Sequence, residues 1–466
     1  MNKNTFQIAI ALMVLCMAHI GCGKEFLEEK PSTAILQPSS LEEFQSLLDN
    51  FEVMNVSTSL GVLAGDEYVF VSDAIWQSAR TTTERNSYVW AKDLYEGEIS
   101  EDWNQPYRAI FYANNILEGI KKIPVTSSNA KTHGNIHGWA LFVRAFAYFE
   151  LVNNFAPTYN SLSSKTDLGV PLRLYPSVDE LLPRASVQSC FDRILDDLNE
   201  ASRLLDTAIP TDNRNRPSKI ACFALLARIY LQMGNYEKAE YFAGQALQIS
   251  DKLMDYKSLN RSSANPFPQN NDELIYAKLG TTKAAYSAAG TFTQISDELL
   301  NLYAPNDLRK LIFFNKKADG NYNIKRGYHG LTSQPFIGLA VDELYLIKAE
   351  CLARRQEIGT AMDLLNQLLK KRWDANLTIP AVPYQNLVAS TSKAALDLVL
   401  LERRKELVWR GIRWDDLKRL NRDGANIVLS RSVLGHHYTI APNSPKYIFP
   451  IPDNEIALSG IPQNNR

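Results

Sequence analysis

Two glutamates, Glu402 and Glu406, lie four residues apart in the segment LERRKELVWRGIRWDDLKR (residues 401–419). On a helix this spacing places both carboxyl groups on one face, the arrangement that a general acid and a general base would need. The segment also carries five basic residues close to this pair, namely Arg403, Arg404, Lys405, Arg410 and Arg413. So many positive charges favour a network of ion pairs over a catalytic dyad. We therefore predict that the two glutamates stabilise the fold.

The sequence offers little else for catalysis or metal binding. His133 and His137 have the spacing of a shared metal site, but Gly134 weakens a helix there and no third ligand is nearby. No His-Glu-x-x-His, Gly-x-Ser-x-Gly, P-loop or dinucleotide-binding glycine motif occurs in the 466 residues. We therefore predict no metal site, no cofactor and no enzymatic activity, which leaves binding as the class of function to consider.

Candidate binding residues are aromatic side chains outside helical patterns. Trp76 lies in the polar stretch VSDAIWQSARTTTERN (residues 71–86), together with Arg80 and Asn86, and Tyr68 precedes it. A flat aromatic face beside Arg and Asn side chains is the composition of a carbohydrate site. The other tryptophans that we considered follow helical patterns, so we expect them in the core: Trp103, Trp139, Trp373, Trp409 and Trp414.

Two further loops carry aromatic residues. The loop GTTKAAYSAAGTF (residues 280–292) presents Tyr286 and Phe292, and the loop DGNYNIKRGYHG (residues 319–330) presents Tyr322 and Tyr328. An ordinary half-buried aromatic is the alternative interpretation at each of these positions, and at Trp76. We predict a ligand-binding set that consists of Trp76, Arg80, Tyr68, Asn86 and Tyr286.

Composition limits the possible partners. An apolar fraction of 45% and a charged fraction of 22% are typical of a globular protein. Fifty basic residues against fifty-one acidic residues leave a net charge of −1, so the chain lacks the positive field of a nucleic-acid binder. Cys190, Cys222 and Cys351 lie within apolar helical patterns, where we expect free, buried thiols, with one long-range disulfide as the alternative.

The amino terminus has the layout of an export signal. Lys3 precedes an apolar run over residues 8–17, which is too short to span a bilayer as a helix. Gly21 directly before Cys22 resembles the lipobox of bacterial lipoproteins, in which the cysteine is acylated, although His19 stands where Leu is usual. Ordinary secretion with Cys22 unmodified is the alternative. We expect a signal peptide over residues 1–21 and a lipidated tether over residues 22–36.

Apolar spacing of three and four residues from position 37 onward predicts a mainly α fold with long irregular loops and few short strands. Residues 218–250 have the spacing of a tetratricopeptide repeat, in which Gly234-Asn235 supplies the turn between two helices. A looser copy covers residues 341–372, and a split third copy pairs residues 137–155 with residues 186–205.

The most specific residues resemble those of the SusD/RagB family of Bacteroidota. Residues 401–419 are similar to its signature of a helix, a glycine and a second basic helix, although Asp415 stands where an aromatic residue is common. Further matching positions are Phe26-Leu27-Glu28, Lys30-Pro31, Trp103, Tyr107, Ile110, Asn114, Asn115, Ile116, Leu117, Arg144-Ala145, Tyr148-Phe149, Leu151, the run from Tyr447 to Pro452, and Gln463-Asn464.

This resemblance implies a SusD-like fold with tetratricopeptide-type units, in one composite domain over residues 37–466. Its N-terminal part would end near residue 215, and its repeat-containing part would begin near residue 216. The resemblance also implies a lipoprotein on the cell surface, held in the outer membrane, that captures a glycan or oligosaccharide for a SusC-like TonB-dependent transporter. A family member that binds a peptide or another nutrient is one alternative, and an exported polysaccharide hydrolase is another.

Overall fold

The computed structural model describes residues 38–177, 179–283, 285, 292–330 and 334–466. Residues 40–466 form one unit, in which helices carry most of the chain. The predicted signal peptide, Cys22 and the tether lie outside the described residues and stay predictions. Among the helices that are described, none is both long enough and apolar enough to cross a lipid bilayer.

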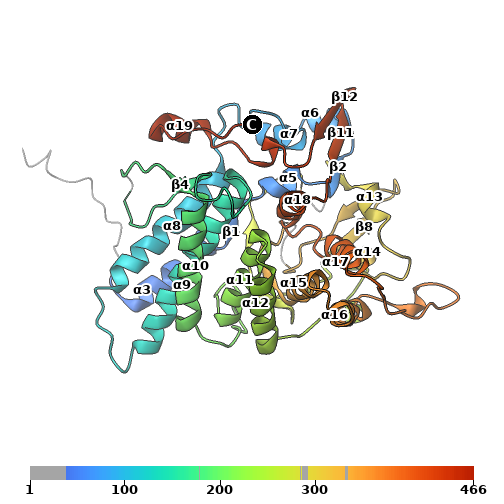
Figure 1. Ribbon diagram of the computed structural model, residues 1–466, viewed down its shortest axis with the longest axis horizontal. Helices are drawn as coiled ribbons and strands as arrows, with labels where there is room; N and C mark the ends of the chain where they lie inside the picture. Colours follow the sequence, from blue (N-terminus) through green and yellow to red (C-terminus); the bar gives the residue numbers. More distant parts are fainter. Residues whose placement is uncertain (1–37, 178, 284, 286–291, 331–333) are drawn as a thin grey trace, which may run out of the picture. The chain divides into compact units, whose positions relative to one another are not determined.

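The N-terminal helices pack around α9, which is buried from Gly138 to Phe155. Figure 1 shows these helices side by side: α3 (Leu41–Leu48), α8 (Glu101–Ile120), α9 (Ala130–Phe155) and α10 (Val187–Leu204). Arg144 on α9 links three of these helices through hydrogen bonds. Its guanidinium donates to both carboxylate oxygens of Asp197 on α10 (2.7 and 2.9 Å) and to Oδ1 of Asn114 on α8 (2.9 Å).

The predicted tetratricopeptide unit is a helical hairpin of α11 (Lys219–Met233) and α12 (Tyr236–Ile249). Gly234 takes a left-handed φ of +77° in the turn, and the Asn235 side chain accepts a hydrogen bond from the Lys238 N–H at the start of α12. Three small residues of α12 are fully buried, which allows the close approach of the two helices: Ala239, Ala243 and Ala246. The prediction for this segment is confirmed.

The other two predicted helix pairs also form. The looser copy is α15 (Val341–Arg354) with α16 (Ile358–Lys370), and the split copy is α9 with α10. Helix α12 packs against α15, and α17 (Ser392–Glu406) packs on the other side of α15. The repeats therefore share a core, as stacked helical units do.

Short strands pair in local hairpins or between segments that are distant in the sequence. The paired strands are β1 (Val56–Ser57) with β6 (Leu279–Gly280), β2 (Tyr68–Phe70) with β7 (Thr293–Ile295), β3 (Leu168–Pro171) with β4 (Arg184–Ser186), β5 (Leu274–Tyr276) with β10 (Leu339–Ala340), β8 (Phe314–Lys316) with β9 (Tyr322–Ile324), and β11 (Leu429–Val433) with β12 (His436–Ile440). The β1–β6 pair is parallel and the others are antiparallel. The β1–β6, β2–β7 and β5–β10 pairs join segments that are distant in the sequence.

The remaining helices are short, and several of them lie around the upper part of Figure 1. They are α4 (Phe51–Met54), α5 (Leu60–Ala64), α6 (Asp73–Gln77), α7 (Thr82–Tyr88), α13 (Asp297–Leu300), α14 (Arg309–Phe313), α18 (Arg413–Arg422) and α19 (Asp453–Ser459), with the 3-10 turns η1 (Tyr256–Ser258), η3 (Ala375–Leu377) and η4 (Pro445–Tyr447).

Candidate functional site

Glu402 and Glu406 on α17 form ion pairs inside the protein. Glu402 Oε2 lies 2.6 Å from Nη2 of Arg309, and Glu406 Oε2 lies 3.1 Å from Nη1 of the same guanidinium. Glu406 Oε1 also accepts from Nε of Arg372 at 2.7 Å, and Glu402 Oε1 lies 2.8 Å from Nζ of Lys405. The side chains of the two glutamates are 7% and 0% exposed. The predicted ion-pair network is therefore confirmed, and both carboxylates are engaged in it.

A second group of ion pairs joins α17 to α18 and α15, beginning with Arg403 Nε on α17, which lies 2.8 Å from Asp416 on α18. Arg419 on α18 forms a bidentate pair with Glu350 on α15 (2.6 and 2.8 Å) and also contacts Asp416 at 2.7 Å. Burial alone would raise the pKa of Asp416, but the guanidinium groups of Arg403 and Arg419 lower that pKa to about 2. We call these paired side chains of α14, α15, α17 and α18, with Arg372, the signature network.

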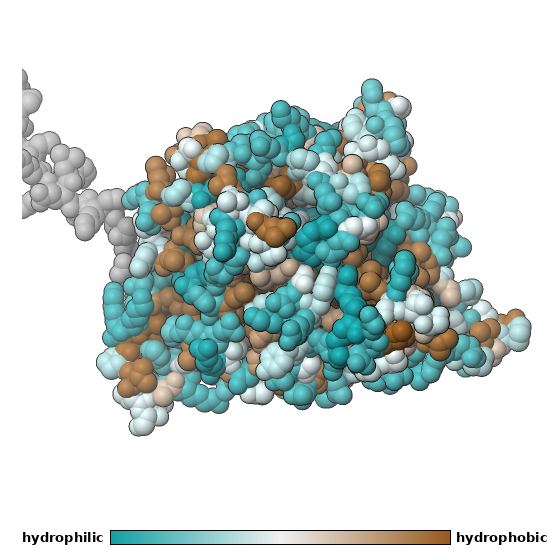
Figure 2. Space-filling model, viewed as in Figure 1, coloured by the Kyte–Doolittle hydropathy of each residue, from teal (hydrophilic) through white to brown (hydrophobic). Residues whose placement is uncertain are grey.

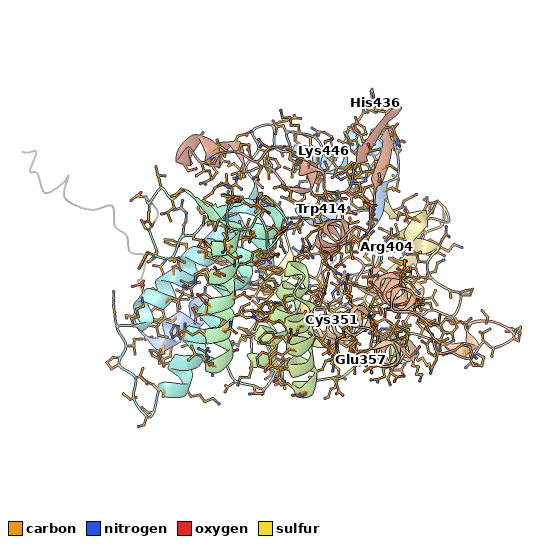
Figure 3. All side chains as sticks on the ribbon, viewed as in Figure 1. Cys351, Glu357, Arg404, Trp414, His436 and Lys446 are labelled. Atoms are coloured by element: carbon orange, nitrogen blue, oxygen red, sulfur yellow. The ribbon has the colours of Figure 1, made fainter. Side chains whose placement is uncertain are left out.

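The tryptophans of the signature segment are core residues, as predicted. Trp409 is 4% exposed and Trp414 is 1% exposed. Trp414 stacks on Phe449 at a ring distance of 5.5 Å, and its Nε1 donates to the carbonyl of Tyr447 at 3.2 Å, so the closing segment packs on α18. Figure 3 shows Trp414 on this helix, with Arg404 on the neighbouring α17.

Gly411 has a left-handed conformation, with a φ of +68°. The helix before it ends at Glu406, and residues 407–410 form a turn between α17 and α18. Trp409 within this turn also has a positive φ, of +62°. A Cβ atom at position 411 would lie 2.2 Å from Cδ1 of Ile337, so this position requires glycine for its space as well as for its backbone.

Two acidic residues connect the signature segment to β2. Asp66 accepts from both Nε and Nη2 of Arg413 (2.8 and 2.7 Å) and from Nη2 of Arg404 (3.1 Å). Although burial alone would raise the pKa of Asp66, these cations lower it to about 2. Glu67 accepts the backbone N–H of Trp409 at 3.1 Å. Burial, helped by the Asp66 charge, raises the pKa of Glu67 to about 8.

The stretch that contains Trp76 meets two distant segments. Strand β2 pairs with β7 next to it, and the Val71 N–H donates to the carbonyl of Phe292 at 3.1 Å. The Leu434 N–H, at the tip of the β11–β12 hairpin, donates to Asp73 Oδ2 on α6 at 3.0 Å. The end of the second predicted loop therefore lies beside the first loop. We call residues 71–86 the α6–α7 surface.

Trp76 and Arg80 are presented on this surface. Trp76 is half-buried on α6, and its Nε1 donates to the carbonyl of Arg85 at 3.1 Å, which fixes the orientation of the indole ring. Arg80 is exposed and forms no hydrogen bond or ion pair with any residue that the structure describes. The guanidinium is therefore accessible at the surface.

The other predicted site residues lie differently. Tyr68 is 1% exposed, and its hydroxyl donates to the carbonyl of Leu63 at 2.9 Å. Tyr68 is the first residue of β2 and its ring packs in the core, so it presents no face to a ligand, which corrects the prediction for this residue. Asn86 Nδ2 donates to the carbonyl of Asp93 (3.1 Å) and to Glu96 Oε1 (2.9 Å), so this amide holds the following turn.

The candidates in the second and third loops have different outcomes. Tyr286 lies outside the described residues and stays a prediction. In the third loop, Tyr328 is buried with its hydroxyl on Glu273, whereas Tyr322 is half-buried. Only Tyr322 of the described pair is therefore partly accessible at the surface.

Trp373 lies outside the helix in which we expected it. It does not belong to a helix, because α16 ends at Lys370, and its backbone pairs with Asp307 in an isolated bridge. The ring is half-buried beside the loop that follows, so the prediction of core packing is wrong. The proline-containing stretch LTIPAVPYQNL (residues 377–387) is the signal for such a loop.

Comparison with known proteins covers both halves of the chain. The model of a family described as "Starch-binding associating with outer membrane" (SusD-like) matches residues 25–231, and the model of the SusD family (SusD/RagB) matches residues 312–465. The chain belongs to the SusD family. Among its SusD relatives is SusD-like protein P38 of Formosa agariphila, 24% identical over 384 residues, which cover 69% of this chain and 72% of that protein. SusD-like protein P25 of the same organism is 24% identical over half of this chain and 44% of that protein.

Solved SusD structures have the same fold. A SusD superfamily protein from Bacteroides thetaiotaomicron superposes with a TM-score of 0.72 at 22% identity, over 92% of this chain and all of that chain. A laminarin-binding SusD-like protein superposes with a TM-score of 0.62 at 19% identity, over 90% of this chain and 97% of that chain. The predicted SusD-like fold, mainly α with few short strands, is confirmed.

Proposed function

We propose that this SusD family protein binds a glycan on the α6–α7 surface and delivers it to a SusC-like TonB-dependent transporter, without catalysing a reaction. The observation that carries the proposal is a half-buried Trp76, whose indole N–H is fixed by the Arg85 carbonyl, with an exposed Arg80 four residues later in the chain. An aromatic face can stack on the apolar side of a sugar ring, while a guanidinium donates hydrogen bonds to its hydroxyl groups.

The surroundings of Trp76 suit a ligand that is a long chain. The α6–α7 surface is built from short helices at the exterior, and β7 and the β11–β12 hairpin support it from other parts of the sequence. A polysaccharide can pass across an exposed surface in both directions, so the protein can bind internal sugar units. The description of the matching family as starch-binding and the laminarin-binding relative support a glycan as the ligand class.

Acylation of Cys22 would place this site at the outer membrane. Each acyl methylene that enters the bilayer contributes about 0.8 kcal/mol, so several acyl chains hold a protein firmly. Capture at the membrane raises the ligand concentration beside the transporter, which favours uptake.

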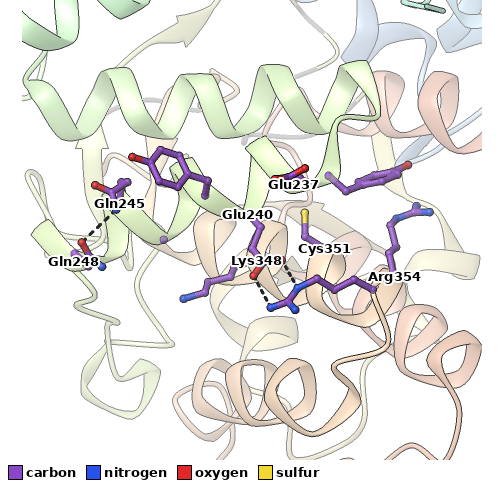
Figure 4. Close-up of a pocket in the computed structure, with 11 residues that line it drawn as sticks. Glu237, Glu240, Gln245, Gln248, Lys348, Cys351 and Arg354 are labelled. Atoms are coloured by element: carbon purple, nitrogen blue, oxygen red, sulfur yellow. Dashed lines mark hydrogen bonds and ion pairs between the residues drawn. The ribbon is translucent and has the colours of Figure 1, made fainter.

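The repeat helices are the proposed contact surface for the transporter. Between α12 and α15 runs a groove of about 610 Å³, shown in Figure 4. Glu240 on α12 and Arg355 after α15 form a bidentate ion pair across it (2.8 and 2.9 Å), and Tyr241 on its border is 59% exposed. Broad faces of stacked repeats are suited to protein partners.

Native gels that contain a soluble polysaccharide test the glycan proposal. Laminarin, starch and other neutral polymers would be screened with the mature chain from residue 23 onward. We expect at least one polymer to retard the protein, and Trp76→Ala to weaken this binding by about tenfold. Tyr241→Ala removes an exposed aromatic ring elsewhere and should leave the retardation unchanged.

Two results would favour the alternatives. Release of sugars from a polymer by the purified protein would indicate a hydrolase. Binding to a peptide library, with no retardation by any polysaccharide, would indicate a peptide-binding member of the family.

A further inference from the structure

The loop after α16 encloses a cavity that the sequence did not predict. Its volume is about 340 Å³, within the range of small-molecule sites. The rings of Trp373 and Tyr384 form two of its walls, with centroids 5.9 Å apart and planes at 68° to each other. Both rings are half-buried, and Leu369 and Leu387 complete the apolar lining.

Hydrogen bonds hold these walls in place. Trp373 Nε1 donates to the carbonyl of Val382 at 2.8 Å, which closes the loop on itself. Asn366 on α16 accepts from the Leu387 N–H (2.8 Å) and donates to the Leu387 carbonyl (2.9 Å). The Tyr384 hydroxyl donates to Asn366 Oδ1 at 2.6 Å. The cavity is therefore formed before a ligand arrives, which reduces the entropy lost on binding.

The floor of the cavity is polar, and its charged groups are paired with one another or with neighbouring carboxylates. Two acidic and three basic residues line it: Asp307, Glu402, Arg309, Arg372 and Lys405. Lys405 Nζ lies 2.8 Å from Glu402 and 3.2 Å from Asp307, Arg309 lies 2.6 Å from Glu402, and Arg372 lies 2.7 Å from Glu406, so each cation has a carboxylate partner. Such a floor does not favour an ion, but its donors and acceptors can bond hydroxyl groups.

We propose that this cavity is a second saccharide subsite, which takes one or two uncharged sugar units against the adjoining rings of Trp373 and Tyr384. Two aromatic walls beside a polar floor of paired charges match the apolar faces and the hydroxyl groups of a sugar ring. In Figure 1 this loop projects at the lower right, whereas α6 lies at the top, so the subsite is separate from the α6–α7 surface. The ligand class rests on the proposed function.

An aliphatic side chain of a protein partner is the competing occupant. The loop exposes Ile379 (101%), Val382 (42%) and Val388 (83%), and Figure 2 shows apolar residues on the segment that projects at the right. An aliphatic group would fill the apolar walls, but it would offer nothing to the polar groups of the floor. The sugar therefore complements more of this cavity than an aliphatic side chain does.

Fluorine NMR of the full-length mature protein, labelled with fluorotryptophan, reports on each of the seven tryptophans separately. Trp76→Phe and Trp373→Phe assign the two signals of interest. The probes are short neutral oligosaccharides from laminarin, starch, xylan and mannan. We expect the Trp373 signal to move at saturable concentrations, Tyr384→Ala to weaken that response by about tenfold, and Tyr384→Phe to retain it, because the phenyl ring keeps the wall.

The two signals separate this inference from the proposed function. Movement of Trp373 without Trp76 supports the second subsite and contradicts glycan binding on the α6–α7 surface. A shift of the Trp76 signal alone overturns the second subsite. If neither signal shifts with any saccharide, both proposals are overturned. A Trp373 signal that ignores every saccharide but moves on addition of the purified transporter also overturns the inference, in favour of protein docking.

Discussion

Arginine side chains are placed in opposite ways in two regions of the molecule. In the signature network, Arg309 and Arg372 are 2% and 1% exposed at the side chain, and each contacts at least two carboxylates. On the α6–α7 surface, Arg80 is exposed and has no partner among the described residues. Tryptophan shows the same contrast, since Trp414 is buried between helices and Trp76 lies half-exposed on a short helix.

This contrast separates the residues that are easiest to recognise from those that we propose to bind ligand. The signature segment has the strongest pattern in the sequence, yet its charges pair inside the protein and join α14, α15, α17 and α18. A buried charge is costly without its partner, so few other residues can replace the charged residues of this segment. A binding surface needs only a few accessible side chains, and these form no recognisable motif in a single sequence.

The largest effect is expected from breaking the signature network. Glu406→Ala leaves Arg309 and Arg372 without a shared carboxylate in the interior. We expect the free energy of unfolding to fall by about 3–5 kcal/mol, measured by urea denaturation. Lys393→Ala, which breaks an exposed ion pair with Asp397 at the start of the same helix, should change it by less than about 0.5 kcal/mol. Similar losses for both variants would contradict the contrast between buried and exposed charges.

A substitution of Glu67, which accepts the Trp409 N–H of the signature segment next to β2, tests the protonation state of this buried carboxyl group. Burial raises the pKa of Glu67 to about 8 in the folded protein, from 4.5 in an unfolded chain, so the folded state binds the extra proton between these values. Stability from this group is fully present below about pH 4.5 and is lost as pH rises through about 8. The slope is at most about 1.4 kcal/mol per pH unit. Glu67→Gln, which keeps an acceptor for the Trp409 N–H, should flatten the stability profile between pH 5 and 8.

A matched control for the pH experiment is Glu357→Gln, because the Glu357 side chain is 52% exposed. That variant should keep the slope of the wild-type protein. An unchanged slope in the Glu67→Gln variant would show that this carboxyl group is ionised in the folded state, contrary to the account.

Gly411→Ala probes the turn inside the signature segment. The new methyl group would lie 2.2 Å from Ile337 Cδ1, at a backbone φ of +68°. We expect a loss of about 1–3 kcal/mol in urea denaturation from the steric conflict and the strained backbone. Gly424→Ala shares the positive φ, +91°, but meets no atom within 4 Å, so it should cost only about 1 kcal/mol. Equal losses at both positions would show that contact with Ile337 is unimportant.

The smallest effect on stability is expected at Arg80. Arg80→Ala should weaken glycan binding by a factor of about three to ten and change the free energy of unfolding by less than about 0.5 kcal/mol. Isothermal titration calorimetry and urea denaturation measure the two quantities. Arg203→Ala, another exposed arginine on α10, serves as the control and should bind glycan as the wild-type protein does. A loss of stability without a loss of binding would place Arg80 with the structural residues.

Patterns local to one helix were predictable from the sequence. The helix pairs and the Gly234 turn follow from apolar spacing and from the conformations that glycine allows. The pairing of Glu402 and Glu406 with cations followed from the local excess of basic residues, although their main partners, Arg309 and Arg372, come from other segments.

Positions that depend on distant contacts were harder to predict. Tyr68 looked like a surface residue because its sequence neighbours are polar, and its burial follows from the pairing of β2 with β7. Trp373 continued the apolar spacing of α16, but the helix ends before it and the bridge to Asp307 turns the chain outward. A single sequence does not carry these pairings, so the burial of Tyr68 and the position of Trp373 could not be predicted from it.

Hydrogen exchange with and without the polysaccharide that retards the protein tests the central claim most directly, because it compares the two regions in one experiment. We expect bound glycan to slow the exchange of backbone amides over residues 71–88 and to leave residues 392–422 unchanged. Protection of residues 392–422 without protection of residues 71–88 would show that the signature segment binds the ligand and would contradict the account.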